Sequence, residues 1–377
     1  MKAVFLHIFL SALIIQAKAQ TIDPAIESRL ADLPGVTENL QTFEQFGVKE
    51  PATQALENTG TWLFQFAENL GYDVEFDSFK DPLDRWQRNV VVSIPGTMDD
   101  YFIVVGAHFD TRRGTGTNDN GSGVVALLNT LKVLTGYQPT YGIRMVFFSG
   151  EEQGFHGSTH YVDDVLSGES GDLLLMLNVD QIGGTAGAEG NDKIFCERDE
   201  NNEPASNNES SNLITDTLSE LTKLYTSLEP VLSKAFGSDY EPFEDAGEVI
   251  TGLYQFAPYP FTHTVSDSLQ YLDTNSLKQA VRLVTAATMY FSGQKTLNVD
   301  QVFVPGIALY PNPSSGRVYC AGITRTDHVD IFNLHGVKIS RLVLENGWFD
   351  ISELQAGIYI AVVSEREKLF HTRLVVQ

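Results

Sequence analysis

Short apolar runs alternate with helical segments along most of the chain, and this alternation constrains the fold most strongly. Residues 102–107 and 173–179 are apolar runs of strand length, which is typical of strands buried on both faces of a sheet. Between them, residues 121–134 predict a helix rich in small and aliphatic side chains, and residues 144–149 predict another buried strand. Strands alternating with helices predict an α/β fold with a mainly parallel central sheet flanked by helices.

Further elements extend this pattern on both sides. Residues 184–212 are rich in Gly, Asn, Glu and Ser, so we expect an excursion over the surface there, with residues 193–196 as a candidate short strand. The other expected elements are helices at residues 53–70, 213–228 and 276–290, and strands at residues 74–79 and 89–94.

The two ends of the chain differ from the middle. Lys2, an apolar stretch over residues 3–15 and the small residues around Lys18 predict a signal peptide, residues 1–19, cleaved after Ala19. No other segment is long and apolar enough to cross a membrane. Short alternating segments with turns predict a small antiparallel β-sandwich over residues 302–377. The expected catalytic domain therefore covers residues 20–296.

The charge balance and the cysteines exclude several functions. With 49 acidic and 25 basic residues the net charge is -24, which argues against nucleic acid and anionic membranes as partners. Most of this charge suits solubility. Cys196 and Cys320 are too few and too distant for a zinc–thiolate site, and we expect no disulfide between different domains.

Two motifs place candidate ligands after the strand that ends near residue 107. His108 is a candidate metal ligand, and Asp110 could accept the other ring N–H of the histidine. A lone histidine is more often structural, however. Asp119 stands before the helix of residues 121–134, where its two oxygens could bridge two metal ions or could cap the helix.

Three more motifs follow later predicted strands. Of the adjacent Glu151 and Glu152, one could bind a metal while the other acts as a base, although a solvated acidic turn is the simpler alternative. Asp180 ends an apolar strand, where a bare carboxylate is costly unless it is paired. His263 could be a ligand or an ordinary loop histidine. Together, the ordered set offers the nitrogen and oxygen ligands that zinc accepts.

This ordered set resembles the di-zinc exopeptidase family that includes secreted bacterial leucine aminopeptidases, glutamate-carboxypeptidase-type enzymes and animal-type glutaminyl cyclases. The resemblance covers roughly residues 24–295. It rests on the stretches G-A-H-F-D, N-D-N-G-S-G, S-G-E-E-x-G and H-T-x-x-D, together with Ser238-Asp239-Tyr240. It implies a zinc-exopeptidase fold and two Zn²⁺ ions per catalytic domain.

Residue by residue, the resemblance implies a ligand set. His108 and Asp180 would hold one zinc, Glu152 and His263 would hold the other, and Asp119 would bridge them. Such a site activates a water for attack on a peptide carbonyl. The resemblance therefore implies a secreted metallo-exopeptidase that removes N-terminal residues from peptides with a free N-terminus.

The resemblance also assigns roles to two further carboxylates. Asp110 would orient His108, and Glu151 would be the general base that takes the proton of the water. A cis peptide often follows the bridging aspartate in the family, which here would be the Asp119–Asn120 bond.

The C-terminal segment carries a resemblance of its own. The stretches L-Y-P-N-P-S-S-G and L-Q-A-G-I-Y, with Lys368 and Arg373 near the end, resemble the C-terminal sorting domain of the bacterial type IX secretion system. This implies a secreted or cell-surface protein of a Gram-negative bacterium, with the secretion machinery as a partner. The alternative is an accessory β-sandwich that binds carbohydrate or protein.

Three other functions remain open. A glutaminyl cyclase-like acyltransferase would use one zinc, and a carboxypeptidase-type member would need a basic group such as Arg112 or Arg113 for a substrate carboxylate. An inactive scaffold used as an adhesin would be expected to have lost ligands, whereas every ligand position is present here. Some secreted relatives carry a disulfide-bounded loop with a helping tyrosine, but residues 233–237 contain neither residue type.

Overall fold

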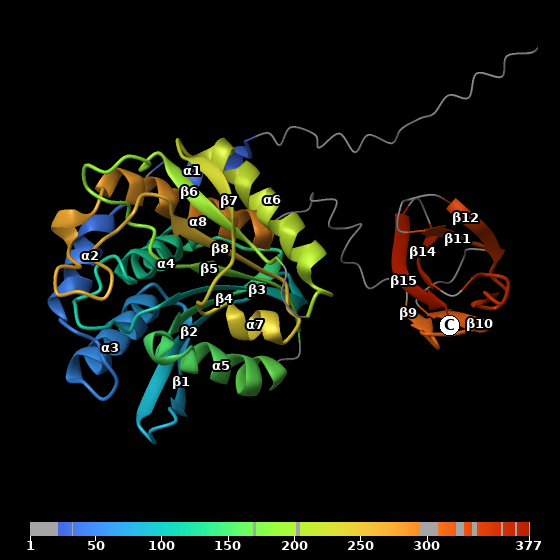
Figure 1. Cartoon of the computed structure of the whole chain (residues 1–377), viewed down its shortest axis with the longest axis horizontal. Helices are drawn as coiled ribbons and strands as arrows, with labels where there is room; N and C mark the ends of the chain where they lie inside the picture. Colours follow the sequence, from blue (N-terminus) through green and yellow to red (C-terminus); the bar gives the residue numbers. More distant parts are fainter. Residues whose placement is uncertain are drawn as a thin grey trace, which may run out of the picture. The chain divides into compact units, whose positions relative to one another are not determined.

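The structure is a computed structural model. The chain divides into two compact units, Met1–Gln294 and Lys295–Gln377 (Figure 1). The predicted signal peptide, residues 1–19, lies outside the described residues. No helix in the described part of the chain is long and apolar enough to cross a membrane. The structure describes residues 22–31, 33–168, 171–200, 204–293, 308–321, 328–333, 338–355, 357–365 and 368–376.

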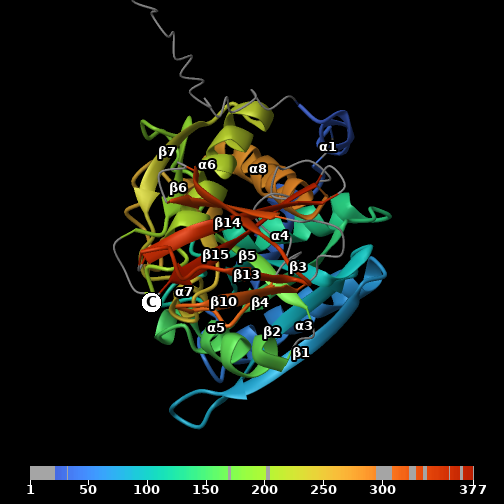
Figure 2. The same cartoon turned by 90° about the vertical axis from the view of Figure 1, so that its right-hand side faces the viewer.

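An eight-stranded mixed sheet forms the centre of the first unit, in the order β1-β2-β4-β3-β5-β8-β6-β7. Four neighbouring pairs are parallel and three are antiparallel, which confirms the predicted α/β fold. The β1–β2 hairpin lies at one edge of the sheet, and β6 and β7 lie at the other (Figure 2). The strands are β1 Asp73–Lys80, β2 Trp86–Ile94, β3 Met98–His108, β4 Tyr141–Phe148, β5 Asp172–Val179, β6 Lys193–Arg198, β7 Glu229–Lys234 and β8 Ile250–Gln255.

Helices cover both faces of this sheet because its central strands are apolar on both sides. The helices α4 (Gly121–Leu134) and α8 (Thr274–Gly293) pack together against one face. On the other face, α5 (His156–His160) and α7 (Glu241–Asp245) cover an apolar cluster that includes Phe148 (Figure 1). The other α-helices of the described residues are α1 Pro24–Arg29, α2 Val36–Gln45, α3 Gln54–Asn69 and α6 Asn208–Tyr225.

The segment that precedes the sheet is tied into this unit. Arg282 on α8 donates to both carboxylate oxygens of Glu27 on α1, each at 2.7 Å. Lys49 is fully buried, and its Nζ donates to the carbonyl of Thr115 at 2.8 Å and lies 3.8 Å from the ring centroid of Phe43 on α2. Burial lowers the pKa of Lys49 to about 7. Through its hydrogen bond to Thr115, Lys49 connects the segment before the sheet to the loop between β3 and α4.

The candidate short strand at residues 193–196 is confirmed, but it is part of the central sheet and not of a surface excursion. Residues 193–198 form β6, which lies inside the sheet between β8 and β7, with Ile194 and Cys196 buried. Neither β7 nor β8 was predicted. The strands β6, β7 and β8 have only six residues each. The polar, glycine-rich residues that flank β6 and Gly252 within β8 weaken the apolar pattern by which such short strands could be predicted.

The second unit is a small antiparallel sandwich, as predicted. One sheet has the order β13-β10-β9 and the other β12-β11-β14-β15. Their inner faces share one apolar core that includes Val318, Phe349 and Leu374. Cys320 in this core and Cys196 in the first unit are both free thiols. The strands are β9 Ala308–Tyr310, β10 Arg317–Ala321, β11 His328–Asn333, β12 Lys338–Val343, β13 Trp348–Asp350, β14 Gly357–Glu365 and β15 Lys368–Val376.

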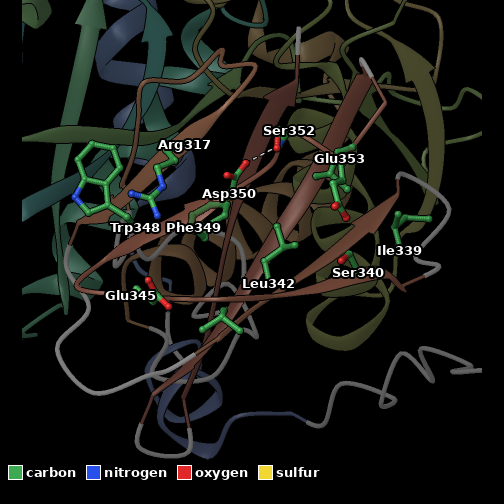
Figure 3. A pocket seen from close by; sticks show the side chains of 12 residues that line it. Arg317, Ile339, Ser340, Leu342, Glu345, Trp348, Phe349, Asp350, Ser352 and Glu353 are labelled. Carbon is green, nitrogen blue, oxygen red and sulfur yellow. Dashed lines mark hydrogen bonds between the residues drawn. The ribbon is translucent and has the colours of Figure 1, made fainter.

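A groove of about 570 Å³ opens between β12 and β13, which are edge strands of the two sheets (Figure 3). Trp348 and Arg317 line it at one end, and Ile339 lines it at the other. The carboxylate of Asp350 accepts the N–H of Ser352 at 2.9 Å. The groove is a surface feature of the sandwich and contains no cluster of metal-ligand side chains.

Candidate metal centre

Five side chains named from the sequence meet at the ends of neighbouring strands. His108 is the last residue of β3, and Asp180 directly follows β5. Glu152 lies in a 3₁₀ turn, Glu151–Gln153, that follows β4. Asp119 lies on the loop from β3 to α4, and His263 lies on the loop after β8. Because β3, β4, β5 and β8 run parallel, their carboxyl ends form one edge, where sites of α/β folds are built.

These side chains form two groups that share one aspartate. The ligand atoms of His108, Asp119 and Asp180 lie within 4.8 Å of one another, as do those of Asp119, Glu152 and His263. His108 Nε2 lies 3.4 Å from Asp119 Oδ1, and His263 Nε2 lies 3.2 Å from Asp119 Oδ2. The two oxygens of Asp119 therefore face different histidines, as a bridging carboxylate would.

Several of these atoms are buried without a hydrogen bond. This holds for His108 Nε2, Asp119 Oδ2, Glu152 Oε1 and Asp180 Oδ1. Buried polar atoms left without a partner are costly and rare, so several at one point fit the ligand atoms of a cation site. Imidazole nitrogens and carboxylate oxygens are ligands that zinc accepts. The residues present therefore fit a divalent metal ion such as zinc.

The electrostatics of the cluster lead to the same conclusion. Burial, together with the nearby Asp119, raises the pKa of Glu152 to about 8. Burial also raises the pKa of Glu151 well above its ordinary value. Burial alone would lower the pKa of His108, but the facing carboxylates, Glu151 first, raise it well above normal. Ionising these buried carboxyl groups is costly, and a divalent cation would stabilise their charged form.

Asp110 lies against His108 with both its backbone and its side chain. His108 Nδ1 lies 3.1 Å from the backbone carbonyl of Asp110, whereas Asp110 Oδ1 lies farther away, at 3.6 Å. The carboxylate also accepts the N–H groups of Glu151 and Glu152, each at 3.2 Å. Asp110 therefore connects His108 to the turn that carries both glutamates.

The loop that carries Asp119 is fixed by residues whose roles sequence reasoning missed. Asp267 accepts the N–H of Asn118 at 2.8 Å and the N–H of Asp119 at 3.1 Å. Asn120, and not Asp119, caps α4 by accepting the N–H of Gly123. The Asp119–Asn120 peptide is cis, as the resemblance implies. The aspartate of the H-T-x-x-D stretch was the available signal for Asp267.

A second support holds Asp180. Its Oδ2 accepts the hydroxyl of Ser238 at 2.9 Å, and the oxygen of Ser238 accepts the side-chain amide of Asn178 at 2.9 Å. Ser238 lies on the loop between β7 and α7, so an element distant in sequence orients this carboxylate. Such outer partners orient ligands in metal sites.

The chain is similar to known peptidases. Residues 89–288 match the family described as Peptidase family M28, and residues 308–377 match a secretion system C-terminal sorting domain. Leucine aminopeptidase 2 of Trichophyton equinum is 36% identical over 101 residues, which are 26% of this chain and 20% of that protein. The chain thus spans about a fifth of the length of this curated relative.

Solved structures share the fold of the first unit. A zinc aminopeptidase from Bacillus subtilis superposes with a TM-score of 0.60 at 17% identity, covering 70% of this chain and 97% of that chain. A Bacteroides thetaiotaomicron glutaminyl cyclase bound to N-acetylhistamine has a TM-score of 0.58 at 18% identity, covering 69% and 98%. At such identities these similarities establish the fold alone. The family match covers more than half of the chain, so the protein belongs to peptidase family M28 and ends in a sorting domain of the type IX secretion system.

Proposed function

We propose that this protein is a secreted metallo-aminopeptidase that binds two zinc ions and removes N-terminal residues from peptides. The observation that carries the proposal is the pair of ligand groups that share Asp119. His108 and Asp180 would hold one ion with it, and Glu152 and His263 would hold the other. Two zinc ions there would lower the pKa of a water and polarise the scissile carbonyl.

Glu151 is the general base in this proposal. It belongs to neither ligand group, and its Oε2 lies 3.8 Å from His108 Nε2 at the edge of the cluster. A carboxylate in this place can take a proton from the attacking water and return it to the leaving amine. The carboxylate of Asp110 holds the backbone of Glu151 in position.

The acidic surroundings of the cluster suit a substrate with a free amino terminus. Glu151, Glu152, Asp180 and Asp239 contribute carboxyl groups within or beside it, and a protonated α-amine is attracted to such a field. This supports an aminopeptidase over an enzyme that cleaves within a chain.

Two alternatives share the fold. A glutaminyl cyclase would use one zinc, whereas here a second ligand group, Asp119, Glu152 and His263, is complete. A carboxypeptidase-type enzyme would recognise a substrate carboxylate, for which Arg112 offers a group. The complete ligand set also argues against an inactive binding scaffold.

The proposed route outside the cell uses both ends of the chain. The sorting domain implies export by the type IX machinery to the cell surface or beyond. We propose residues 1–19 as the signal peptide, 20–296 as the catalytic domain and 302–377 as the sorting domain. The peptidase substrates would then be peptides or proteins outside a Gram-negative cell.

The experiment that tests the proposal measures zinc per chain in the purified protein and assays a panel of peptides for stepwise loss of N-terminal residues. Two zinc ions with release from the amino end would support it. One zinc with cyclisation of N-terminal glutamine, and no hydrolysis, would replace it with the cyclase. Release from the carboxyl end would favour the carboxypeptidase-type alternative.

A further inference from the structure

A tight turn on the loop between β3 and α4 carries Arg112 and packs against the loop of His263. Gly114 N donates to the carbonyl of Arg112 at 2.8 Å, and Thr111 Oγ1 donates to the carbonyl of Gly114 at 3.0 Å. Thr111 is also bonded through its own N–H to the carbonyl of Lys49 at 3.1 Å. The backbone that carries Arg112 is therefore held in one conformation.

This turn packs directly against the loop of His263. A Cβ atom added to Gly114 would lie 2.0 Å from the carbonyl oxygen of Thr264, so the two backbones are in contact. Thr115 Oγ1 extends the contact by donating to the carbonyl of Asp267 at 2.6 Å. The charge of Arg112 also acts on His263. The pKa of His263 is raised, chiefly by its hydrogen bond to Asp119, and Arg112 opposes that rise.

Arg112 is exposed, and its guanidinium makes no ion pair or hydrogen bond with the described residues. Some arginines of this unit are paired with acids, as Arg88 is with Glu57 and Arg282 is with Glu27. An unpaired guanidinium beside a carboxylate-rich cluster, in a chain of net charge -24, is free to bind an incoming anion. The planar group favours carboxylates because it can donate two parallel hydrogen bonds.

We infer that Arg112 binds a carboxylate of the substrate on the His263 side of the centre. This inference rests on the proposed aminopeptidase function and narrows its substrate class. Favoured substrates carry a carboxylate close to the scissile bond. That carboxylate is either the C-terminus of a dipeptide or the side chain of an acidic second residue.

The test compares three substrates: Leu-Ala, Leu-Ala amide and Leu-Asp amide. The zinc-loaded full chain is assayed beside Arg112→Gln and Arg113→Gln. Arg113 is the matched control because it is the exposed neighbour and, unlike Arg112, is not among the charges that act most strongly on His263. We expect Arg112→Gln to lower kcat/KM for Leu-Ala about tenfold, as for loss of a charge-assisted hydrogen bond, mainly through KM. Hydrolysis of Leu-Ala amide, zinc content and the activity of Arg113→Gln should change by less than about twofold, as expected where no contact is lost.

The substrates also show which carboxylate Arg112 binds, and they distinguish failure of this inference from failure of the aminopeptidase proposal. A loss on Leu-Asp amide assigns the side chain, and a loss on Leu-Ala assigns the terminus. Equal losses on Leu-Ala and Leu-Ala amide, or the same losses in Arg113→Gln, would overturn the inference while hydrolysis itself persists. Failure of the unaltered protein on all three substrates would instead overturn the aminopeptidase proposal, and this inference with it.

Discussion

The two units treat their acidic residues in opposite ways. The first unit buries carboxyl groups at the carboxyl edge of its sheet, where Asp119, Glu152 and Asp180 have oxygens without hydrogen bonds. The sandwich of the second unit has an apolar core, and its Asp330 is paired at the surface with Lys338 and Arg341. Buried, unsatisfied acids cost stability, so their concentration in one unit locates the chemistry there.

Two acids, one from each unit, have pKa values shifted in opposite directions. Burial raises the pKa of Glu197, on β6 of the first unit, to about 8. In the second unit, the hydrogen bond from Arg341 and the charge of Lys338 hold the pKa of Asp330 well below its ordinary value. At neutral pH Glu197 therefore retains its proton and is uncharged, whereas Asp330 is ionised and is neutralised by its two basic partners.

Replacing the proposed base gives the largest expected effect. Glu151→Gln should lower kcat for an N-terminal leucine amide by roughly 10²–10⁴-fold, the usual contribution of a general base. Zinc per chain should stay unchanged, because Glu151 is outside both ligand groups. Steady-state kinetics and metal analysis of the same sample check this, and Glu152→Gln is the matched variant that should lose metal. Turnover that survives in Glu151→Gln would contradict the assignment.

Metal removal should change the thermal stability of the first unit but not that of the second. A chelator should lower the Tm of the first unit by roughly 5–10 °C, because a tightly bound ion stabilises only the folded state. The sandwich should not respond, since no group of metal-ligand side chains lies among its described residues. Scanning calorimetry of the full chain measures both transitions. Asp119→Asn should abolish the response, and a chelator effect of equal size on both units would break the comparison.

A buried acid should make the first unit less stable as pH rises. Because the folded pKa of Glu197 is raised to about 8, folding retains a proton that the unfolded chain releases above its ordinary pKa of 4.5. Stability is thus fully present below about pH 4.5 and falls until about pH 8, by up to about 1.4 kcal/mol per pH unit. Other acids of this unit with raised pKa values, such as Glu152, add to the same slope, so Glu197→Gln should make the slope shallower in urea unfolding measured across that range.

The control for this pH dependence is Glu189→Gln, a change at an exposed loop position of the same unit. It should leave the slope as it is. If Glu197→Gln and the unaltered protein lost stability in parallel between these pH values, Glu197 would not carry the effect, and the contrast between the units would lose one of its supports.

The smallest effect is expected in the sandwich. Asp330→Asn should lower the free energy of unfolding of the second unit by at most about 1 kcal/mol at pH 7, as for exposed ion pairs. Because the folded pKa is depressed, the advantage of the aspartate is present above its ordinary value of 3.8 and is lost as pH falls through the folded pKa. Unfolding at pH 7 and pH 2 checks this, and a difference that grew at low pH would reverse the expected sign.

Local pattern predicted most of the elements but not all of the sheet. The helix of residues 121–134 has the bounds of α4, because its small and aliphatic side chains lie between a capping asparagine and Thr135. The strands β7 and β8 were not predicted, and β6 was predicted without its place inside the sheet, since each strand is short and its position depends on pairing with distant neighbours. Pairing of this kind is a long-range property that local periodicity does not contain.

The candidate site was likewise predictable only in part from the sequence. The residue types of the ligand set, from His108 to His263, and their positions after strands could be named from the sequence. That Asp267 fixes the Asp119 loop, that the carbonyl of Asp110 meets His108, and that Ser238 orients Asp180 could not. Those contacts depend on how loops from separate strands pack.

By itself, the sequence determined which chemical groups are available and which segments are strands or helices, because side-chain chemistry and hydrophobic period are local properties. The tertiary structure decided which of these groups face each other. It turned the two oxygens of Asp119 toward different histidines and left Arg112 unpaired beside His263. Parallel strands bring their carboxyl ends to one edge, but only register and loop packing set distances of a few ångströms, and the chemistry depends on those distances.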